Sequence, residues 1–182
     1  MKPNALEACM SAMEATWGPL TAKMASGCRL HLEQLLLTEA SEDWLSALHR
    51  TQPISSELYR SPVNGFMLLA HTEHEGLYRP PHDHGRGWVI YAVQQGEIEM
   101  GTYARVEGPD GKIRLVKRDA TLVRAGQTRM FWPGDIHDTL CVSGPALLFR
   151  FTDRDLWRED REEHRLTRYV ESDGAWTTPA HD

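Results

Sequence analysis

Between residues 64 and 152 the sequence consists of short apolar stretches that are separated by turn-forming residues. The stretches include GFMLLAH, GWVIYAVQQ, TRMFW and PALLFRF, and they are bounded by residues such as Gly96, Gly126 and Pro133-Gly134. Runs of this length, rich in branched and aromatic side chains, predict β-strands rather than helices. Their spacing favours an antiparallel sandwich or barrel. The segment GPDG at 108–111 predicts a hairpin turn.

The N-terminal part of the chain has a different pattern, in which apolar residues recur at helical spacing. Leu32, Leu35 and Leu36 belong to one such segment. Ser41, which precedes Glu42 and Asp43, is predicted to cap the next helix.

The length of 182 residues suits a single domain with three parts. We expect a helical segment at 1–55 that packs on a barrel at 56–155, and a charged C-terminal extension at 156–182. The charges of this extension are expected to form a solvated face, with Leu156, Trp157 and Tyr169 docked on the barrel.

Charge and cysteine content exclude several classes of protein. A net charge of −6 without a long lysine or arginine run argues against nucleic acid and anionic membranes as partners. The cysteines Cys9, Cys28 and Cys141 lack CxxC spacing, which argues against a zinc knuckle and for reduced thiols. No apolar run resembles a signal peptide or a membrane span. The expected localisation is therefore cytoplasmic.

Two histidines in the stretch RPPHDHGRGW offer a pair of metal ligands. In an extended strand, His82 and His84 leave from the same face, and Asp83 points the opposite way and is expected to make structural hydrogen bonds. Nine histidines in the chain would produce such a pair by chance with appreciable frequency, so the spacing alone is weak. Its position behind Pro80-Pro81, together with a second histidine motif, PGDIH ending in His137, strengthens the prediction.

Taken together, the HDH stretch, glycines at the later turns and the segment WPGDIH resemble the two sequence motifs of the cupin superfamily. The matching positions run from about 80 to 96 and from 126 to 137. The resemblance implies a mainly β fold, the cupin double-stranded β-helix or jelly-roll barrel, preceded here by the helical segment. It also implies His82, His84 and His137 as the metal ligands.

The usual cupin glutamate, four or five residues after the histidine pair, is replaced here by Trp88 and Val89. A site of three histidines without a carboxylate resembles that of the thiol dioxygenases, the cysteine and mercaptopropionate dioxygenase branch of the superfamily. Nitrogen ligands suit Fe(II), and Zn, Ni or Mn are alternatives. The implied partners are a small-molecule substrate and dioxygen. A homodimer is compatible with the sequence.

One feature of that branch is expected to be missing. Its Ser-His-Tyr relay places the last two members on a late strand, where the stretch PALLFRF offers Phe149 and Phe151 instead. Either the thiol reaction runs with other groups, or a neighbouring family uses the same site on a different substrate. No catalytic residue beyond the metal ligands is assigned.

Four polar residues are candidates for binding the substrate. Arg60 lies roughly where the resemblance places the carboxylate-binding arginine of the cysteine dioxygenases, and Arg86 and Tyr91 are polar groups on a turn and a strand of the barrel. Arg150 either points outward into solvent or binds an anion inside, because a buried arginine is costly unless it is paired.

The remaining expectations concern single residues around these motifs. Trp88 and Trp132 are expected to pack the barrel, and Cys141 to be a small buried thiol. His71 is expected to be an ordinary exposed histidine at a strand end.

Three functions stay open on the sequence. The first is a mononuclear non-haem Fe(II) dioxygenase acting on a small thiol or another small anionic metabolite. The second is a cupin with another divalent metal that performs isomerase or lyase chemistry. The third is a non-catalytic ligand-binding cupin.

Overall fold

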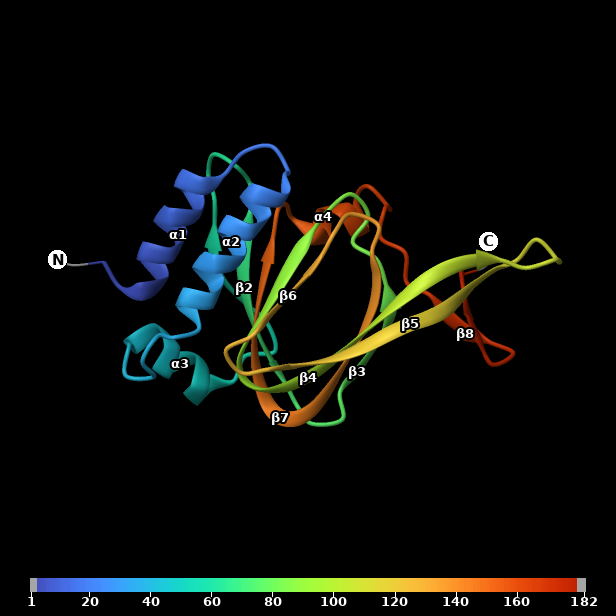
Figure 1. The fold of residues 1–182 in the computed structure, drawn as a ribbon. Helices are drawn as coiled ribbons and strands as arrows, with labels where there is room; N and C mark the ends of the chain where they lie inside the picture. The colour runs from blue at the N-terminus through green and yellow to red at the C-terminus, as the bar shows by residue number, and fades with distance from the viewer. Residues whose placement is uncertain (1–2, 180–182) are drawn as a thin grey trace.

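A computed structural model describes residues 3–179 and shows three N-terminal helices against a strongly curved antiparallel sheet (Figure 1). The helices are α1 (Ala5–Thr16), α2 (Ala22–Leu35) and α3 (Asp43–Thr51), and a short α4 (Leu156–Arg161) follows the main strands. The strands are β1 (Ser56–Arg60), β2 (Met67–Glu73), β3 (Tyr78–His82), β4 (Val89–Glu107), β5 (Ile113–Arg124), β6 (Thr128–Phe131), β7 (Ile136–Thr152), β8 (Val170–Ser172) and β9 (Ala175–Thr177).

Side chains that cap the backbone define where the first helices begin. Asn4 and Glu7 form a capping box at the start of α1, and Thr21 accepts a hydrogen bond from the Met24 amide at the start of α2. The prediction that Ser41 caps α3 is wrong, because Glu42 occupies the cap position. The Ser41 hydroxyl instead donates to the Glu39 carboxylate, so it does not bond the helix amides.

Two long strands, β4 and β7, build the barrel because each runs through both halves of the curved sheet. The first half of β4 pairs with β6 and with the second half of β7. That half of β7 also pairs with β2, and β2 pairs with the edge strand β1. The second half of β4 pairs with β5 and with the first half of β7, which pairs with β3. Both strands therefore bend from one half of the sheet into the other. The predicted fold class, mainly β with N-terminal helices and a double-stranded β-helix or jelly-roll barrel, is confirmed by this pairing.

The bend in β4 occurs at Gly96, where the register to β7 shifts repeatedly. Gly96 has a φ of +81°, a conformation that favours glycine. A Cβ atom at this position would lie 2.5 Å from the Ser143 carbonyl oxygen. The glycine thus permits both the backbone conformation and the close approach of the two bent strands.

The helices cover the outer face of the sheet that contains β2, the first half of β4 and the second half of β7 (Figure 1). Trp17 on the α1–α2 connection stacks on Trp88 and contacts Phe66 and Phe151. The expected packing of Trp88 is confirmed, since it is almost fully buried. A second apolar cluster, including Val89, fills the inside of the barrel. These strands are thus buried on both faces.

The charged C-terminal extension also adds secondary structure to the barrel. Its strand β9 pairs with β5 through Thr177 and Arg114, and β8 pairs with β9. The hairpin predicted at GPDG is confirmed, because it joins β4 to β5. Among the helices of the described residues, none has the length and apolarity that crossing a membrane requires.

Candidate metal centre

The structure brings together the three histidines that the sequence singles out. His82 is the last residue of β3 and lies opposite His137 on β7. The donor atoms of these two residues and of His84 all lie within 4.8 Å of one another, and the Nε2 atoms of His84 and His137 are 2.9 Å apart.

His84 reaches the cluster from a turn rather than from a strand, which differs from the prediction. β3 ends at His82, and the chain then turns at Gly85, which has a φ of +60°. Asp83 holds this turn, since one of its carboxylate oxygens accepts hydrogen bonds from the amides of Gly85 and Thr167. The structural role expected for Asp83 is therefore confirmed.

A hydrogen bond to the backbone decides which ring nitrogen of His82 can bind a metal ion. Its Nδ1 atom lies 2.8 Å from the Pro80 carbonyl oxygen. Because a carbonyl oxygen only accepts, Nδ1 carries the proton and donates it. The Nε2 atom of His82 therefore keeps a lone pair for a ligand.

Burial keeps the three imidazoles neutral. It lowers the pKa of His82, and it lowers the pKa of His84 and of His137 well below the usual range, with the neighbouring histidine charges as a further cause. The ring of His137 stacks on Phe131 with a centroid distance of 3.9 Å, which fixes its orientation. Neutral, oriented imidazoles are good metal ligands.

The spacing of His84 and His137 fits two ligands of one divalent ion. Two nitrogen ligands at right angles, each about 2.1 Å from an ion, lie about 3.0 Å apart, close to the 2.9 Å between His84 and His137. Within the described residues, the buried Nδ1 atoms of His84 and His137 have no hydrogen-bond partner, so packing, such as that of His137 on Phe131, orients these rings. A set of three nitrogen donors suits Fe(II), Zn, Ni or Mn but does not distinguish among them.

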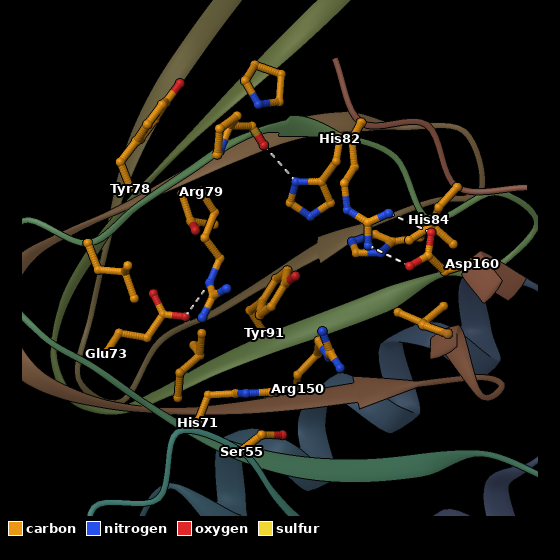
Figure 2. Close-up of a pocket in the computed structure, with 18 of the residues that line it drawn as sticks. Ser55, His71, Glu73, Tyr78, Arg79, His82, His84, Tyr91, Arg150 and Asp160 are labelled. Carbon is orange, nitrogen blue, oxygen red and sulfur yellow. Dashed lines mark hydrogen bonds and ion pairs between the residues drawn. The ribbon is translucent and has the colours of Figure 1, made fainter. Parts of the chain in front are cut away.

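A cavity of about 780 Å³ opens beside the histidines, and Figure 2 shows the side chains around it. β2, β3, β4 and β7 supply one part of its wall, and α4 and the segment after it supply another. The residues in the wall are Ile54, Ser55, His71, Glu73, Leu77, Tyr78, Arg79, Pro80, Pro81, His82, His84, Tyr91, Thr139, Leu148, Arg150, Leu156, Trp157, Asp160, Arg161, Leu166, Arg168 and Tyr169.

Arg150 points into this cavity, so the inward alternative is the correct one (Figure 2). It lies opposite Tyr91 and Leu69 in the β4–β7 and β2–β7 ladders. Its buried Nε atom has no hydrogen-bond partner within residues 3–179, and no ion pair to a carboxylate of that range is formed. Arg150 is therefore a cation that is free to bind an anionic ligand.

The comparison of Phe149 and Phe151 with the relay of the thiol dioxygenases is corrected by the strand's alternation. Both phenylalanines pack toward the helices, where Phe151 contacts Trp17 and Phe149 contacts Trp44. In the second half of β7, the residues that line the cavity are Leu148 and Arg150. The phenylalanines therefore say nothing about which groups surround the metal centre.

Tyr91 is a cavity residue close to the histidines. Its ring centroid lies 5.4 Å from that of His137 and 6.4 Å from that of His84. Burial raises the pKa of Tyr91, so its hydroxyl stays protonated and can donate a hydrogen bond.

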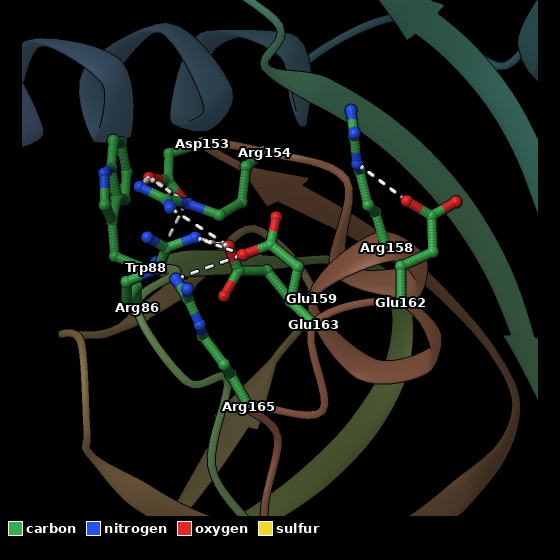
Figure 3. A network of polar contacts seen from close by, with 9 residues as sticks. All are labelled: Arg86, Trp88, Asp153, Arg154, Arg158, Glu159, Glu162, Glu163 and Arg165. Atoms are coloured by element: carbon green, nitrogen blue, oxygen red, sulfur yellow. Dashed lines mark hydrogen bonds and ion pairs between the residues drawn. The ribbon is translucent and has the colours of Figure 1, made fainter.

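The other two predicted substrate-binding residues lie outside the cavity wall. Arg60 forms ion pairs with Glu57 and Asp155. Arg86 forms ion pairs with Glu159 on α4 and with Glu163 (Figure 3). Because both guanidinium groups already form ion pairs with these carboxylates, we do not assign either arginine to the substrate site.

A network of ion pairs around Arg86 connects the turn after His84 to α4. Glu159 is buried and accepts hydrogen bonds from Arg86 and Arg154, and Arg154 also pairs with Asp153 (Figure 3). These contacts anchor the turn that follows His84 to α4. The expectation of a solvated charged face is therefore wrong for Glu159.

Glu73, His71 and Arg168 are among the polar wall residues that were not predicted to belong to a site. Glu73 is buried and pairs with Arg79. His71 faces the cavity from β2, so the expectation of an ordinary exposed histidine is wrong. Arg168 approaches the site because its backbone pairs with that of His82. The alternation of His71 and Glu73 on one strand face was the available signal for two of them.

The structure also tests the expected burial of Trp132 and Cys141. Trp132 does not pack the barrel, since it is 41% exposed in the turn that precedes β7. Cys141 is a buried thiol, as expected, and contacts the Glu73 carbonyl oxygen.

No protein-family model matches this sequence, and no curated protein does. Solved structures similar to it include KdgF from Halomonas sp., with 19% identity over 54% of this chain and 74% of that one, and a TM-score of 0.42. The cupin domain of Cnp3 from Schizosaccharomyces pombe has 13% identity, coverages of 60% and 69%, and a TM-score of 0.43. A cupin superfamily protein from Desulfitobacterium hafniense has 16% identity, coverages of 56% and 76%, and a TM-score of 0.42.

Proposed function

We propose that this protein is a mononuclear non-haem Fe(II) dioxygenase that oxidises a small thiol or another small anionic metabolite. The observation that carries the proposal is a cluster of three neutral histidines, without a carboxylate ligand, beside a cavity that contains the unpaired cation Arg150. His82, His84 and His137 would hold the ion. A bound Fe(II) ion would gather the substrate and dioxygen in one coordination sphere.

The charges of the site favour an anionic substrate. Neutral imidazoles leave the charge of a divalent ion uncompensated, so a thiolate or carboxylate is attracted to it. Arg150 adds a second positive charge in the same cavity, and its guanidinium can form charge-assisted hydrogen bonds with a carboxylate. Tyr91 supplies a neutral hydroxyl donor, and Leu148 and Leu156 contribute apolar surface that limits water around the bound substrate.

Metal analysis and oxygen uptake test this function together. We expect iron in the purified protein, and oxygen consumption with cysteine or 3-mercaptopropionate. Cysteamine, which lacks the carboxylate, should be oxidised more slowly because it cannot use Arg150. Zinc, nickel or manganese without oxygen consumption would contradict the dioxygenase and favour isomerase or lyase chemistry. Ligand binding without turnover would favour a non-catalytic cupin.

A matched pair of variants separates the site from the rest of the chain. His82→Ala should lose both iron and oxygen uptake. His74→Ala removes an exposed histidine outside the cavity wall and should retain both.

A further inference from the structure

The cavity wall contains an unusual concentration of buried polar atoms without partners. Buried polar groups in proteins are nearly always hydrogen-bonded, so such atoms point to a ligand or to ordered water. Within residues 3–179, six residues of the cavity wall have a buried side-chain atom of this kind: His71, Glu73, His84, Thr139, Arg150 and Tyr169. The cavity is thus built for a ligand with several polar groups.

Two of these atoms can only accept hydrogen bonds. The Nδ1 atom of His71 lies 3.1 Å from the Ile54 carbonyl oxygen, so Nδ1 carries the proton and Nε2 is an acceptor. Burial, followed by the charge of Arg150, lowers the pKa of His71 to about 3, and the ring is therefore neutral near pH 7. The Nε2 atom has no partner among the described residues.

Glu73 supplies the second acceptor. Its Oε1 atom accepts from Arg79 at 2.8 Å, while its Oε2 atom is buried without a partner in the described part of the chain. The side chain is 3% exposed. Water or a ligand group that donates hydrogen bonds must satisfy this oxygen, because an unsatisfied buried carboxylate oxygen is costly.

The acceptors and the cation are arranged in order along the cavity. Arg150 lies opposite Tyr91, which is near the metal centre. His71 lies opposite Leu148, two residues before Arg150 on β7, and Glu73 lies opposite Ala146, four residues before it. Figure 2 shows His71 between Arg150 and Glu73, with Glu73 at the far end from His84. Four residues of strand correspond to about 13 Å of backbone, so the two charged groups address well-separated parts of a ligand.

We propose that the ligand of this cavity is a small aliphatic molecule with an anionic group at the Arg150 end and a primary ammonium group that Glu73 and His71 bind. The inference rests on the proposed function in so far as this ligand is the substrate. An ammonium group matches the acceptors because it offers three hydrogen-bond donors and a positive charge. The pairing of Glu73 with Arg79 leaves Oε2 available, so the ammonium does not have to displace that arginine.

Calorimetric titration of the full-length protein with matched ligand pairs tests this specificity. The pairs are 4-aminobutyrate with butyrate and 5-aminopentanoate with pentanoate, which differ only in the ammonium group. At least one amino member should bind about tenfold more tightly than its partner, the gain expected from hydrogen bonds to charged groups. Equal affinities within both pairs, or no binding of either amino member, would overturn the proposal.

Variants of Glu73 and His71 test whether these two residues cause the preference for amino ligands. Glu73→Gln keeps the shape and one acceptor oxygen, and it should weaken binding of the amino member about tenfold while butyrate binding stays unchanged. His71→Phe removes the Nε2 acceptor together with the hydrogen bond from Nδ1 to the Ile54 carbonyl oxygen, and it should weaken binding of the amino member about fivefold. Glu75→Gln makes the same chemical change at an exposed position outside the wall and should have no effect. An equal loss for both members of a pair would show that Glu73 is only structural.

The outcome is independent of the proposed reaction. None of these ligands contains a thiol, and their binding requires neither oxygen nor turnover. A protein that prefers the amino ligands but consumes no oxygen would retain the ammonium site and refute the dioxygenase. A protein that consumes oxygen with 3-mercaptopropionate but shows no preference for amino ligands would refute the ammonium site and retain the dioxygenase.

Discussion

Replacement of Arg150 by methionine should make the protein more stable and weaken its binding of anions. Arg150 lies in the cavity without an ion-pair partner from residues 3–179, and its Nε atom is buried. Replacing a buried ion pair by apolar side chains of similar volume is often neutral or stabilises a protein by about 1–4 kcal/mol, because the cost of desolvating the charges is removed, and this cost also applies to an arginine without a partner. Because Arg150 is only half-buried, we expect a gain of about 1 kcal/mol, near the lower end of that range.

The same substitution should remove the main anion-binding group of the cavity. A hydrogen bond to a charged group contributes about 1.5–3 kcal/mol, so the affinity for butyrate should fall about 10- to 100-fold. The pKa of His71 should rise from about 3, because one positive neighbour is lost, but stay below its ordinary value of 6.5, because burial is the larger cause of the shift.

Three measurements check this prediction: thermal unfolding, calorimetric titration with butyrate, and NMR titration of His71. A gain of about 1 kcal/mol corresponds to a rise of about 2–4 °C in Tm for a chain of this size. Arg118→Met is the matched control, since Arg118 is exposed on β5 and should change neither affinity nor the pKa of His71. A less stable Arg150→Met protein with unchanged affinity would refute the reasoning and make Arg150 a structural residue.

Three further predictions concern the fold and the support of the site. Burial raises the pKa of Glu159, but hydrogen bonds from two arginines outweigh this effect and hold the pKa below its usual range. The ionised Glu159 therefore stabilises the folded state above the unfolded-state pKa, and this stabilisation is lost as the pH falls below about 4. In Glu159→Gln the free energy of unfolding, measured with urea, should decrease less over the same fall in pH. Gly96→Ala should destabilise the protein by more than about 2 kcal/mol, because a Cβ atom there meets Ser143 and Ala146. Gly111 also has a positive φ but has open space around it, so Gly111→Ala should cost about 1 kcal/mol. Equal losses of stability in urea unfolding would contradict this explanation. Arg86→Met should weaken metal binding about tenfold, because Arg86 anchors the turn after His84 to α4; competition with a chelator measures the change, and an unaltered affinity would remove the network from the account.

The strands were predictable because local patterns specify them, whereas the metal cluster was predictable through the resemblance of two motifs to those of the cupin superfamily. Short apolar runs between turn residues predicted the β region, and the motifs around His82 and His137 predicted that these residues meet. The sequence did not predict which side chains of β7 face the barrel interior. Its second half is buried on both faces, by helices on one side and by the barrel interior on the other, so the apolar–polar alternation that would orient Arg150 is missing.

The rest of the cavity depends on contacts between distant segments. The charges after residue 155 resemble those of a solvated tail, yet Arg168 pairs with Asp160 and lies against β3. Glu73 appears as an ordinary strand-end carboxylate until its pairing with Arg79 is known. Neither contact has a local sequence signature, because each requires two segments to be placed side by side by the fold.

Titration of the metal-free protein with Co(II), followed through the visible absorption of the bound ion, tests the central claim most directly. If the imidazoles of residues 82, 84 and 137 form one site, the wild-type spectrum should saturate at one equivalent per chain. His137→Ala should lose this saturable binding, and His74→Ala should retain it. Unchanged binding of Co(II) by His137→Ala would contradict the three-histidine centre and the function that rests on it.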